Sequence, residues 1–194
     1  MKKIFYIIRH GQTELNAKKI WQGCGMDYPL NALGWRQADA AAEKLKDKKL
    51  DIICCSNLQR AFETAITIAK PLRLTVLVNG DFRESYAGQA EGKHISYVME
   101  HFGEIVHPFS YPHQDNLGVC FPGGETLAEV QARVKRGFEF LLRVPANVMG
   151  VVTHAGVMSV ILSYLGYEDV TIKNCEVFKV IYENGIWSTD GILF

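Results

Sequence analysis

An uninterrupted apolar run at residues 4–8, followed at once by Arg9, His10 and Gly11, constrains the fold of this chain most. Apolar runs without alternation are typical of strands buried on both faces, and such strands occur in parallel sheets covered by helices. Ligands of open α/β sheets bind at the carboxyl ends of the strands. The run therefore predicts a strand over residues 3–8 that ends at a candidate site.

The three residues after this strand suit the binding and chemistry of an anion. Glycine lets the backbone turn tightly and approach a ligand closely. Arginine offers planar, permanently charged donors suited to phosphate, and histidine can act as a nucleophile. A strand that happens to end in a polar turn would give the same tripeptide, so its meaning depends on the rest of the chain.

Predicted strands and helices alternate along the whole chain. Further strands are expected over residues 51–55, 74–78, 148–152 and 177–182. Helices are expected from Asn31, as N-cap, to about Asp47, over 58–70, where Pro71 would end the helix, and over 95–101, 127–141 and 156–165. No internal repeat or linker interrupts this order. It predicts an α/β fold of three layers, a largely parallel sheet with helices on both faces, with residues 1–194 as a single domain.

Residues 106–124 break the regular pattern, because they hold three of the six prolines and three glycines. Loops of this length inside compact domains are usually functional or disordered. Phe109, Tyr111 and Phe121 favour a docked segment. We therefore expect a lid or insert over about 85–124. Its aromatic side chains would suit a substrate with an apolar or ring portion, or would pack against the body of the protein.

Charge and cysteine usage exclude several classes of protein. Lys plus Arg and Asp plus Glu number 21 each, so a general nucleic-acid or membrane-surface binder is not expected, and any anion site must be local. No apolar stretch approaches a membrane span or a signal-peptide core. The five cysteines form no C-x-x-C pair, and the adjacent Cys54 and Cys55 should point to opposite faces of a strand. Buried, reduced thiols in a soluble, cytoplasmic protein are predicted.

Charged residues follow three of the predicted strands. The first strand leads to Arg9 and His10, the second is followed by Arg60 in the first turn of the next helix, and the strand at 148–152 leads to His154. In a parallel sheet these ends share one edge, where helix N-termini add oriented N–H groups. Such a convergence of two arginines and two histidines suits a phosphoryl group with its three charged oxygens.

With these residues in place, the chain resembles the histidine phosphatase superfamily, which has the phosphoglycerate mutase-like fold. The matching segments are residues 9–16, 56–65, 83–92, 122–126 and 153–156. They occur in the family's order and lie within residues 4–165. Each alone is a weak to moderate signal, and together they are highly specific.

The resemblance implies that His10 is the nucleophile and forms a phosphohistidine. Arg9, Arg60 and His154 would surround the phosphoryl group, and Asn16 would bind it as well. A nucleophilic imidazole must be neutral, and two neighbouring arginines disfavour its protonation. The same arginines would neutralise charge on the equatorial oxygens in the transition state.

Glu84 resembles the family's proton donor. A single carboxyl group can give a proton to the leaving oxygen and later take one from the attacking water. A solvated loop carboxylate is the simpler alternative. Glu91 is a rival for the role, although its spacing to Gly88 and Gly92 favours a structural one.

Four further residues are candidates for contact with the phosphate or the rest of the substrate. Gly11 and Thr13 belong to the first matching segment, and Gln22 and Gly23 lie in the loop that follows it. That loop departs from the usual family pattern, since it is one residue longer and has Cys24 and Gly25 where an aromatic residue is common.

A metal enzyme would be a different mechanism for a chain with six histidines. His94, His101, His107 and His113 cluster in sequence, but not at the i, i+4 spacing of a helical zinc pair, and no cysteine pair accompanies them. No glycine-rich loop of the Walker or Rossmann type occurs. We predict neither a metal nor an organic cofactor.

The resemblance leaves transfer to water and transfer to a second hydroxyl both open. Mutases of this family are typically longer and carry an insertion with paired arginines and a lysine, whereas residues 106–124 here contain no arginine or lysine. The sequence therefore predicts a phosphomonoesterase acting on a small phosphorylated metabolite, with no nucleic-acid or membrane partner. A phosphoglycerate mutase and a non-catalytic phospholigand-binding protein are the alternatives.

Overall fold

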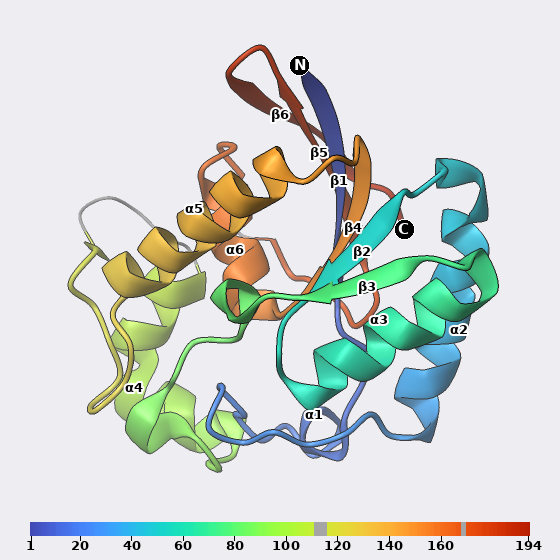
Figure 1. Ribbon diagram of the computed structural model, residues 1–194. Coiled ribbons are helices and arrows are strands. Elements are labelled where there is room, and N and C mark those ends of the chain that lie inside the picture. The colour runs from blue at the N-terminus through green and yellow to red at the C-terminus, as the bar shows by residue number, and fades with distance from the viewer. Residues whose placement is uncertain (111–115, 168–169) are drawn as a thin grey trace.

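Six strands form one mixed sheet in the order β3-β2-β4-β1-β5-β6 (Figure 1). The computed structural model describes residues 1–110, 116–167 and 170–194, with the backbone alone for 107–110. The strands are β1 Lys2–Arg9, β2 Ile52–Cys55, β3 Thr75–Val78, β4 Val148–Thr153, β5 Val177–Glu183 and β6 Ile186–Ile192. The first four in the sheet order are parallel, whereas β5 runs antiparallel to both β1 and β6.

Helices cover both faces of this sheet, as the sequence predicts (Figure 1). They are α1 Glu14–Ala17, α2 Ala32–Leu45, α3 Gln59–Leu72, α4 Ile95–Ser110, α5 Leu127–Arg143 and α6 Ala155–Ser163, with short 3-10 turns η1 Lys46–Lys48, η2 Gly80–Phe82 and η3 Gly88–Ala90. Helices α2 and α3 pack on one face, and α4, α5 and α6 cover the other. Within the described ranges, no helix is both long and apolar enough to cross a membrane.

Successive side chains along each strand point to opposite faces of the sheet, and the core therefore consists of two layers. Phe5 and Ile7 of β1 belong to the core under α5 and α6, whereas Tyr6 and Ile8 belong to the core under α2 and α3. Adjacent Cys54 and Cys55 fall into the two different layers in the same way, as alternation requires. All five cysteines are free thiols.

Local signals at the helix starts account for where the helices begin. The Asn31 side chain accepts a hydrogen bond from the Gly34 amide at 2.8 Å, which confirms it as the N-cap of α2. Helix α3 has no cap from its own N-cap side chain. Instead, the Asp27 carboxylate accepts from the Gln59 amide at 2.8 and 3.0 Å. The loop before α2 is thereby fastened to the start of α3.

Two helices extend further than predicted. Helix α3 continues through Pro71 to Leu72, because a proline this close to the end removes little of the hydrogen-bond ladder. Arg73, with φ of 55°, then ends it. Helix α4 was expected only to residue 101 but continues to Ser110 across a non-helical residue, Phe102. The non-helical backbone at Phe102 interrupts the helical periodicity, so the sequence pattern predicts the helix only up to this point.

The sequence reading also missed strand β6. Its segment holds Ser188, Thr189 and Asp190 and lies at the sheet edge, so it carries little of the apolar signal of a buried strand. Asn184 and Gly185 in the preceding turn have φ values of 51° and 89°. An Asn-Gly pair between two strands is a strong hairpin signal, and it would have revealed β6.

Candidate active site

A cavity of about 440 Å³ opens at the carboxyl edge of the parallel strands. Its lining comes from the end of β1, the loop before α2, the start of α3, the segment after η2 and the first turns of α6. The polar and charged lining residues are Arg9, His10, Gln12, Asn16, Lys19, Gln22, Arg60, Glu84, Ser85, Ser159 and Asn174. The structure thus brings most of the predicted site residues to one place.

His10 stands directly after β1 and is only 3% exposed. Its Nδ1 lies 2.7 Å from the Gly11 carbonyl oxygen. A carbonyl can only accept, so Nδ1 carries the hydrogen and Nε2 keeps its lone pair. Burial lowers the pKa of His10 well below its ordinary value, and the charges of Arg60 and Arg9 lower it further. The imidazole is therefore neutral, and its Nε2 carries the free lone pair that a nucleophile needs.

Arg9 is the last residue of β1 and a half-buried cation beside His10. Its Nη1 donates to the Ile172 carbonyl oxygen at 2.5 Å, which holds the guanidinium in place. Its buried Nε has no hydrogen-bond partner among the described residues. Burial lowers the pKa of Arg9, but a guanidinium stays protonated in proteins. An unpaired buried N–H beside a nucleophile is a ready donor for an anion.

Arg60 in the first turn of α3 is the second cation, and it is fully buried. Its Nη2 donates to the Gly23 carbonyl at 2.7 Å and its Nη1 to the Met26 carbonyl at 3.1 Å. The Asp27 carboxylate lies 3.7 Å from Nη1. As with Arg9, the buried Nε lacks a partner within the described part of the chain. The loop thus aims the guanidinium and leaves one donor free.

His154 follows β4, the strand beside β1, and is completely buried next to His10, with 5.1 Å between the two ring centroids. Its Nε2 lies 2.8 Å from the Ser56 hydroxyl oxygen, and Nδ1 has no partner among the described residues. Burial lowers the pKa of His154 well below its ordinary value, with Arg60 adding to the effect. A serine hydroxyl that donates to Nε2 would place the hydrogen on Nδ1, the nitrogen without a partner.

Glu84 lines the cavity from the segment after η2. Its Oε2 accepts from the Gly156 amide at 3.2 Å, in the first turn of α6, and its Oε1 accepts from the Ser85 amide at 2.9 Å. A Cβ at Gly156 would lie 2.6 Å from Oε1, so a side chain there would displace the Glu84 carboxyl group. The rival Glu91 accepts from the Gly25 and Ala87 amides and does not line the cavity, which agrees with a structural role.

The remaining predicted residues divide into two groups. Asn16, Gln22 and Gly23 line the cavity, and the Gln22 Oε1 is buried without a partner in the described structure. Gly11 and Thr13 do not line it. The Thr13 hydroxyl accepts from the Asn16 amide at 3.1 Å as the N-cap of α1. A Cβ at Gly11 would lie 2.5 Å from the α2 backbone, so this glycine permits α2 to approach the strand end.

Asn174 is a lining residue that the sequence analysis missed. Its Nδ2 donates to the His10 carbonyl at 3.0 Å and lies 3.4 Å from the Asn16 Oδ1. The sequence analysis considered only residues that follow strands. Because β5 runs antiparallel to β1, the residues before β5 reach the same edge, and no motif marks them. Lys19 and Ser159 were missed as well, since they belong to no predicted strand end.

One wall of the cavity is apolar and consists of Ile20, Trp21 and Ile95. The Trp21 ring packs edge-on against Phe121, whose own side chain is 1% exposed. For Phe121, packing against the body is therefore confirmed. Tyr111 and the side chain of Phe109 lie outside the described residues.

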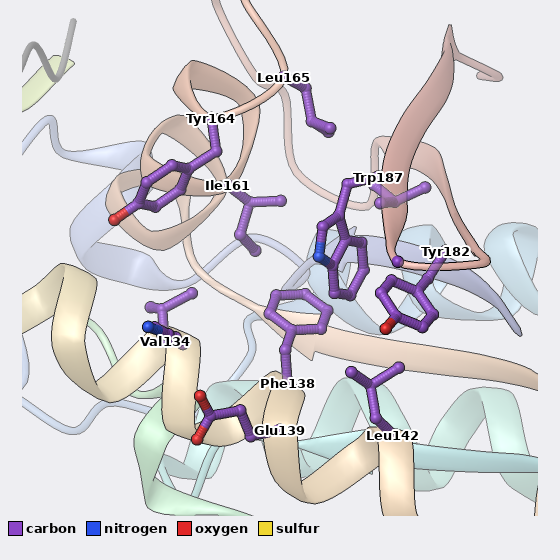
Figure 2. Close-up of a pocket in the computed structure, with 12 residues that line it drawn as sticks. Val134, Phe138, Glu139, Leu142, Ile161, Tyr164, Leu165, Tyr182 and Trp187 are labelled. Atoms are coloured by element: carbon purple, nitrogen blue, oxygen red, sulfur yellow. The ribbon is translucent and has the colours of Figure 1, made fainter.

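A larger cavity of about 580 Å³ lies between α5, α6, β5 and β6. Figure 2 shows its aromatic and aliphatic lining, with Phe138 and Trp187 near its centre. Lys135 and Glu139 are its charged lining residues, and its described lining contains neither histidine nor arginine. The cationic and imidazole groups suited to an anion therefore lie at the smaller cavity. Across the described ranges, no three His, Cys, Asp or Glu side chains are grouped so as to hold a metal ion.

Comparisons with known proteins agree with this geometry. The family profile described as "Histidine phosphatase superfamily (branch 1)" matches residues 5–192. A Hydrogenobacter thermophilus protein, named as a candidate phosphoserine phosphatase, is 34% identical over 166 residues, which cover 85% of this chain and 79% of that protein. Fructose-2,6-bisphosphatase TIGAR of Xenopus tropicalis is 36% identical over 143 residues, 71% of this chain and 49% of TIGAR, so the match spans about half of that relative.

Two solved structures show the same fold. A mycobacterial glucosyl-3-phosphoglycerate phosphatase superposes with a TM-score of 0.83 at 23% identity, covering 97% of each chain. The phosphoglycerate mutase of Bacillus anthracis gives a TM-score of 0.87 at 22% identity over 98% of this chain and 92% of the mutase. At these identities the likeness shows the fold alone. Since the family profile spans nearly the whole sequence, the chain belongs to branch 1 of the histidine phosphatase superfamily.

Proposed function

We propose that this protein is a phosphomonoesterase that works through a phosphohistidine at His10. The observation that carries the proposal is the state of that imidazole, which is neutral, has Nε2 unprotonated, and is close enough to the guanidinium groups of Arg9 and Arg60 for both charges to lower its pKa. Nε2 attacks phosphorus and forms an N–P bond while the bond from phosphorus to the leaving oxygen breaks. Water then attacks the phosphohistidine and releases inorganic phosphate.

The cations around His10 would stabilise the transition state. Arg9 and Arg60 each offer a buried Nε–H that has no partner within the described residues. Such donors are already in place when charge develops on the equatorial phosphoryl oxygens. His154 would donate from Nδ1 and Asn16 from its amide group to the same oxygens. Because backbone carbonyls already hold both guanidinium groups in place, they need not reorient as the transition state forms.

Glu84 would transfer the protons. In the first step its protonated carboxyl group gives a proton to the leaving oxygen, which departs as an alcohol. In the second step the resulting carboxylate takes a proton from the attacking water, so the carboxyl group is restored.

A small phosphorylated metabolite is the proposed substrate class. The cavity of about 440 Å³ has room for such a molecule. The relatives named above include proteins called phosphatases of phosphoserine, fructose 2,6-bisphosphate and glucosyl-3-phosphoglycerate, and one called a mutase. Hydrolysis is favoured over mutase activity because the segment after Glu84, residues 85–93, holds one lysine and no arginine.

The test is a hydrolysis screen across phosphomonoesters, with phosphate release as the measurement. We expect turnover that a chelator leaves unchanged and that His10→Ala abolishes. The same panel includes phosphoglycerates, with isomerisation followed separately. Isomerisation faster than phosphate release would make the protein a mutase. Phosphate binding without turnover of any ester would make it a binding protein.

A further inference from the structure

A buried arginine of helix α5 lies close to the cavity without lining it. Arg133 is 2% exposed, and its guanidinium forms a two-pronged ion pair with Glu125. Nε lies 2.8 Å from Oε1, and Nη2 lies 3.0 Å from Oε2. The third nitrogen, Nη1, donates to two backbone carbonyls, those of Asp81 at 2.8 Å and Arg83 at 2.6 Å. Every nitrogen of this guanidinium is engaged.

Glu125 makes further hydrogen bonds to the segment that contains Asp81 and Arg83. Its Oε1 also accepts from Arg83 Nη2 at 3.0 Å, and its Oε2 accepts from the Tyr86 amide at 3.4 Å. Its own amide donates to the Tyr86 carbonyl at 2.8 Å. The contacts of Arg133 and Glu125 therefore fall at residues 81, 83 and 86. They bracket Glu84, whose carboxyl group lines the cavity and, among the described residues, accepts only from the backbone amides of Ser85 and Gly156.

Packing around η2 also holds residues 81–86, through contacts of Phe82 with α5 and β4. A Cβ at Gly137 of α5 would lie 2.8 Å from the Phe82 ring, so the helix sits directly on that ring. The Phe82 carbonyl accepts from the Thr153 hydroxyl at 2.7 Å, at the end of β4. The backbone leading to Glu84 is thus tied both to α5 and to the strand that carries His154.

We propose that the Arg133–Glu125 ion pair is the positioning device of the proton donor: it sets Glu84 at the leaving oxygen and has no part in binding the phosphoryl group. The inference rests on the function proposed above. Arg9 and Arg60 are held by carbonyls at Ile172, Gly23 and Met26, in parts of the chain that this ion pair does not contact. A change in the pair would therefore affect protonation of the leaving group and spare phosphoryl binding.

Leaving-group dependence separates this role from a merely structural one. A p-nitrophenolate departs readily without a proton, whereas an alkoxide needs one as the bond breaks. If Glu84 is displaced, transfer of the phosphoryl group to His10 should slow much more from an alkyl phosphate than from p-nitrophenyl phosphate. Loss of folded protein would lower both rates by the same factor.

The variants are Arg133→Lys and Glu125→Gln, with Glu84→Gln as the reference for a missing proton donor. Lysine keeps the charge, which also lowers the pKa of His154, but it cannot form the two-pronged pair. Glutamine at residue 125 keeps the size and shape of the side chain but removes its charge. This variant therefore tests the same ion pair if the lysine variant fails to fold. The matched control is Arg136→Gln, which removes a 61% exposed arginine paired with the side chain of Asp81 at 2.9 Å.

We expect kcat/KM for an alkyl phosphate, which reports formation of the phosphohistidine, to fall at least about tenfold in both test variants, within the contribution of a general acid. For p-nitrophenyl phosphate kcat/KM should stay within about threefold of the wild type, whereas kcat falls because the attacking water also loses its base. Arg136→Gln should match the wild type. Equal losses of kcat/KM on the two esters would overturn the inference. Turnover that survives in His10→Ala would instead overturn the proposed function.

Discussion

His10 is neutral for reasons that lie in its immediate neighbours. Burial removes the water that would stabilise an imidazolium, and Arg60 and Arg9 add repulsion. The Gly11 carbonyl fixes the tautomer by accepting from Nδ1. Most of this arrangement could be predicted from the tripeptide and its strand, but the tautomer could not, because it depends on the side-chain rotamer at His10.

Lys19 is a cavity residue whose backbone is held in an uncommon conformation. Its φ is 54°, and its carbonyl accepts from the Ile95 amide at 2.8 Å. In the proposed function Arg9 and Arg60 bind the phosphoryl group, and Lys19 is then the remaining Lys or Arg among the described lining residues. It is therefore placed to contact a second anionic group of the substrate.

Replacing Lys19 should change selectivity and spare the chemistry. We expect Lys19→Gln to raise KM about two- to fivefold for phosphoesters that carry a carboxylate, the range for an exposed ion pair. KM for p-nitrophenyl phosphate should not change. The neighbouring Lys18→Gln, at a position outside the cavity lining, is the control. An equal KM increase for charged and uncharged leaving groups would show that Lys19 has no such selectivity.

At the scale of elements, the loop before α2 is built onto the start of α3. Asp27 accepts from the Gln59 amide, and Arg60 donates to the carbonyls of Gly23 and Met26. The loop supplies the Asp27 carboxylate that caps α3, which has no capping side chain of its own. In return, Arg60 of α3 donates to the carbonyls of the loop. The site cation and the loop that walls the cavity are therefore parts of one structural unit.

Removing the Asp27 carboxylate should disturb stability and binding together. We expect Asp27→Ala to lower the free energy of unfolding by about 1 kcal/mol, the usual effect of losing a helix cap. KM should rise as well, because the loop then holds Arg60 less firmly. Chemical denaturation and steady-state kinetics measure the two effects, with Asp39→Ala on the exposed side of α2 as the control. A variant that lost stability with unchanged KM would show that Asp27 caps α3 without supporting Arg60 at the site.

Elements with strong local signals were predictable, and those defined by distant contacts were not. The apolar run of β1 and the Asn31 cap of α2 are local, so both predictions are confirmed. Asn174 reaches the cavity because β5 runs antiparallel to β1, and no motif marks it. Strand β6 lacks the apolar signal of a buried strand, and its local signal is confined to the Asn184-Gly185 turn before it.

At the scale of the whole molecule, two buried neutral histidines tie stability to pH. The folded chain keeps the pKa of His10 and of His154 well below the ordinary value. Between those lowered values and about 6.5, the unfolded chain binds protons that the folded chain does not. The free energy of unfolding therefore falls as the pH drops below about 6.5.

Each of these histidines contributes at most about 1.4 kcal/mol of unfolding free energy per pH unit in that window. We expect His10→Gln and His154→Gln each to flatten the dependence measured by denaturant unfolding from about pH 7.5 to about 5.5. His101→Gln, at an exposed residue stacked on Tyr97, is the control. An unchanged slope in both buried-site variants would mean that the folded chain protonates these imidazoles.

The central claim is that the phosphoryl group passes through His10 Nε2, and rapid quenching with a ³²P-labelled ester tests it most directly. Glu84→Gln should accumulate the intermediate from p-nitrophenyl phosphate, since water attack then lacks its base. We predict an acid-labile, base-stable label that maps to Nε2 of His10 and is absent in His10→Ala. A label on another residue, or turnover by His10→Ala, would contradict the account.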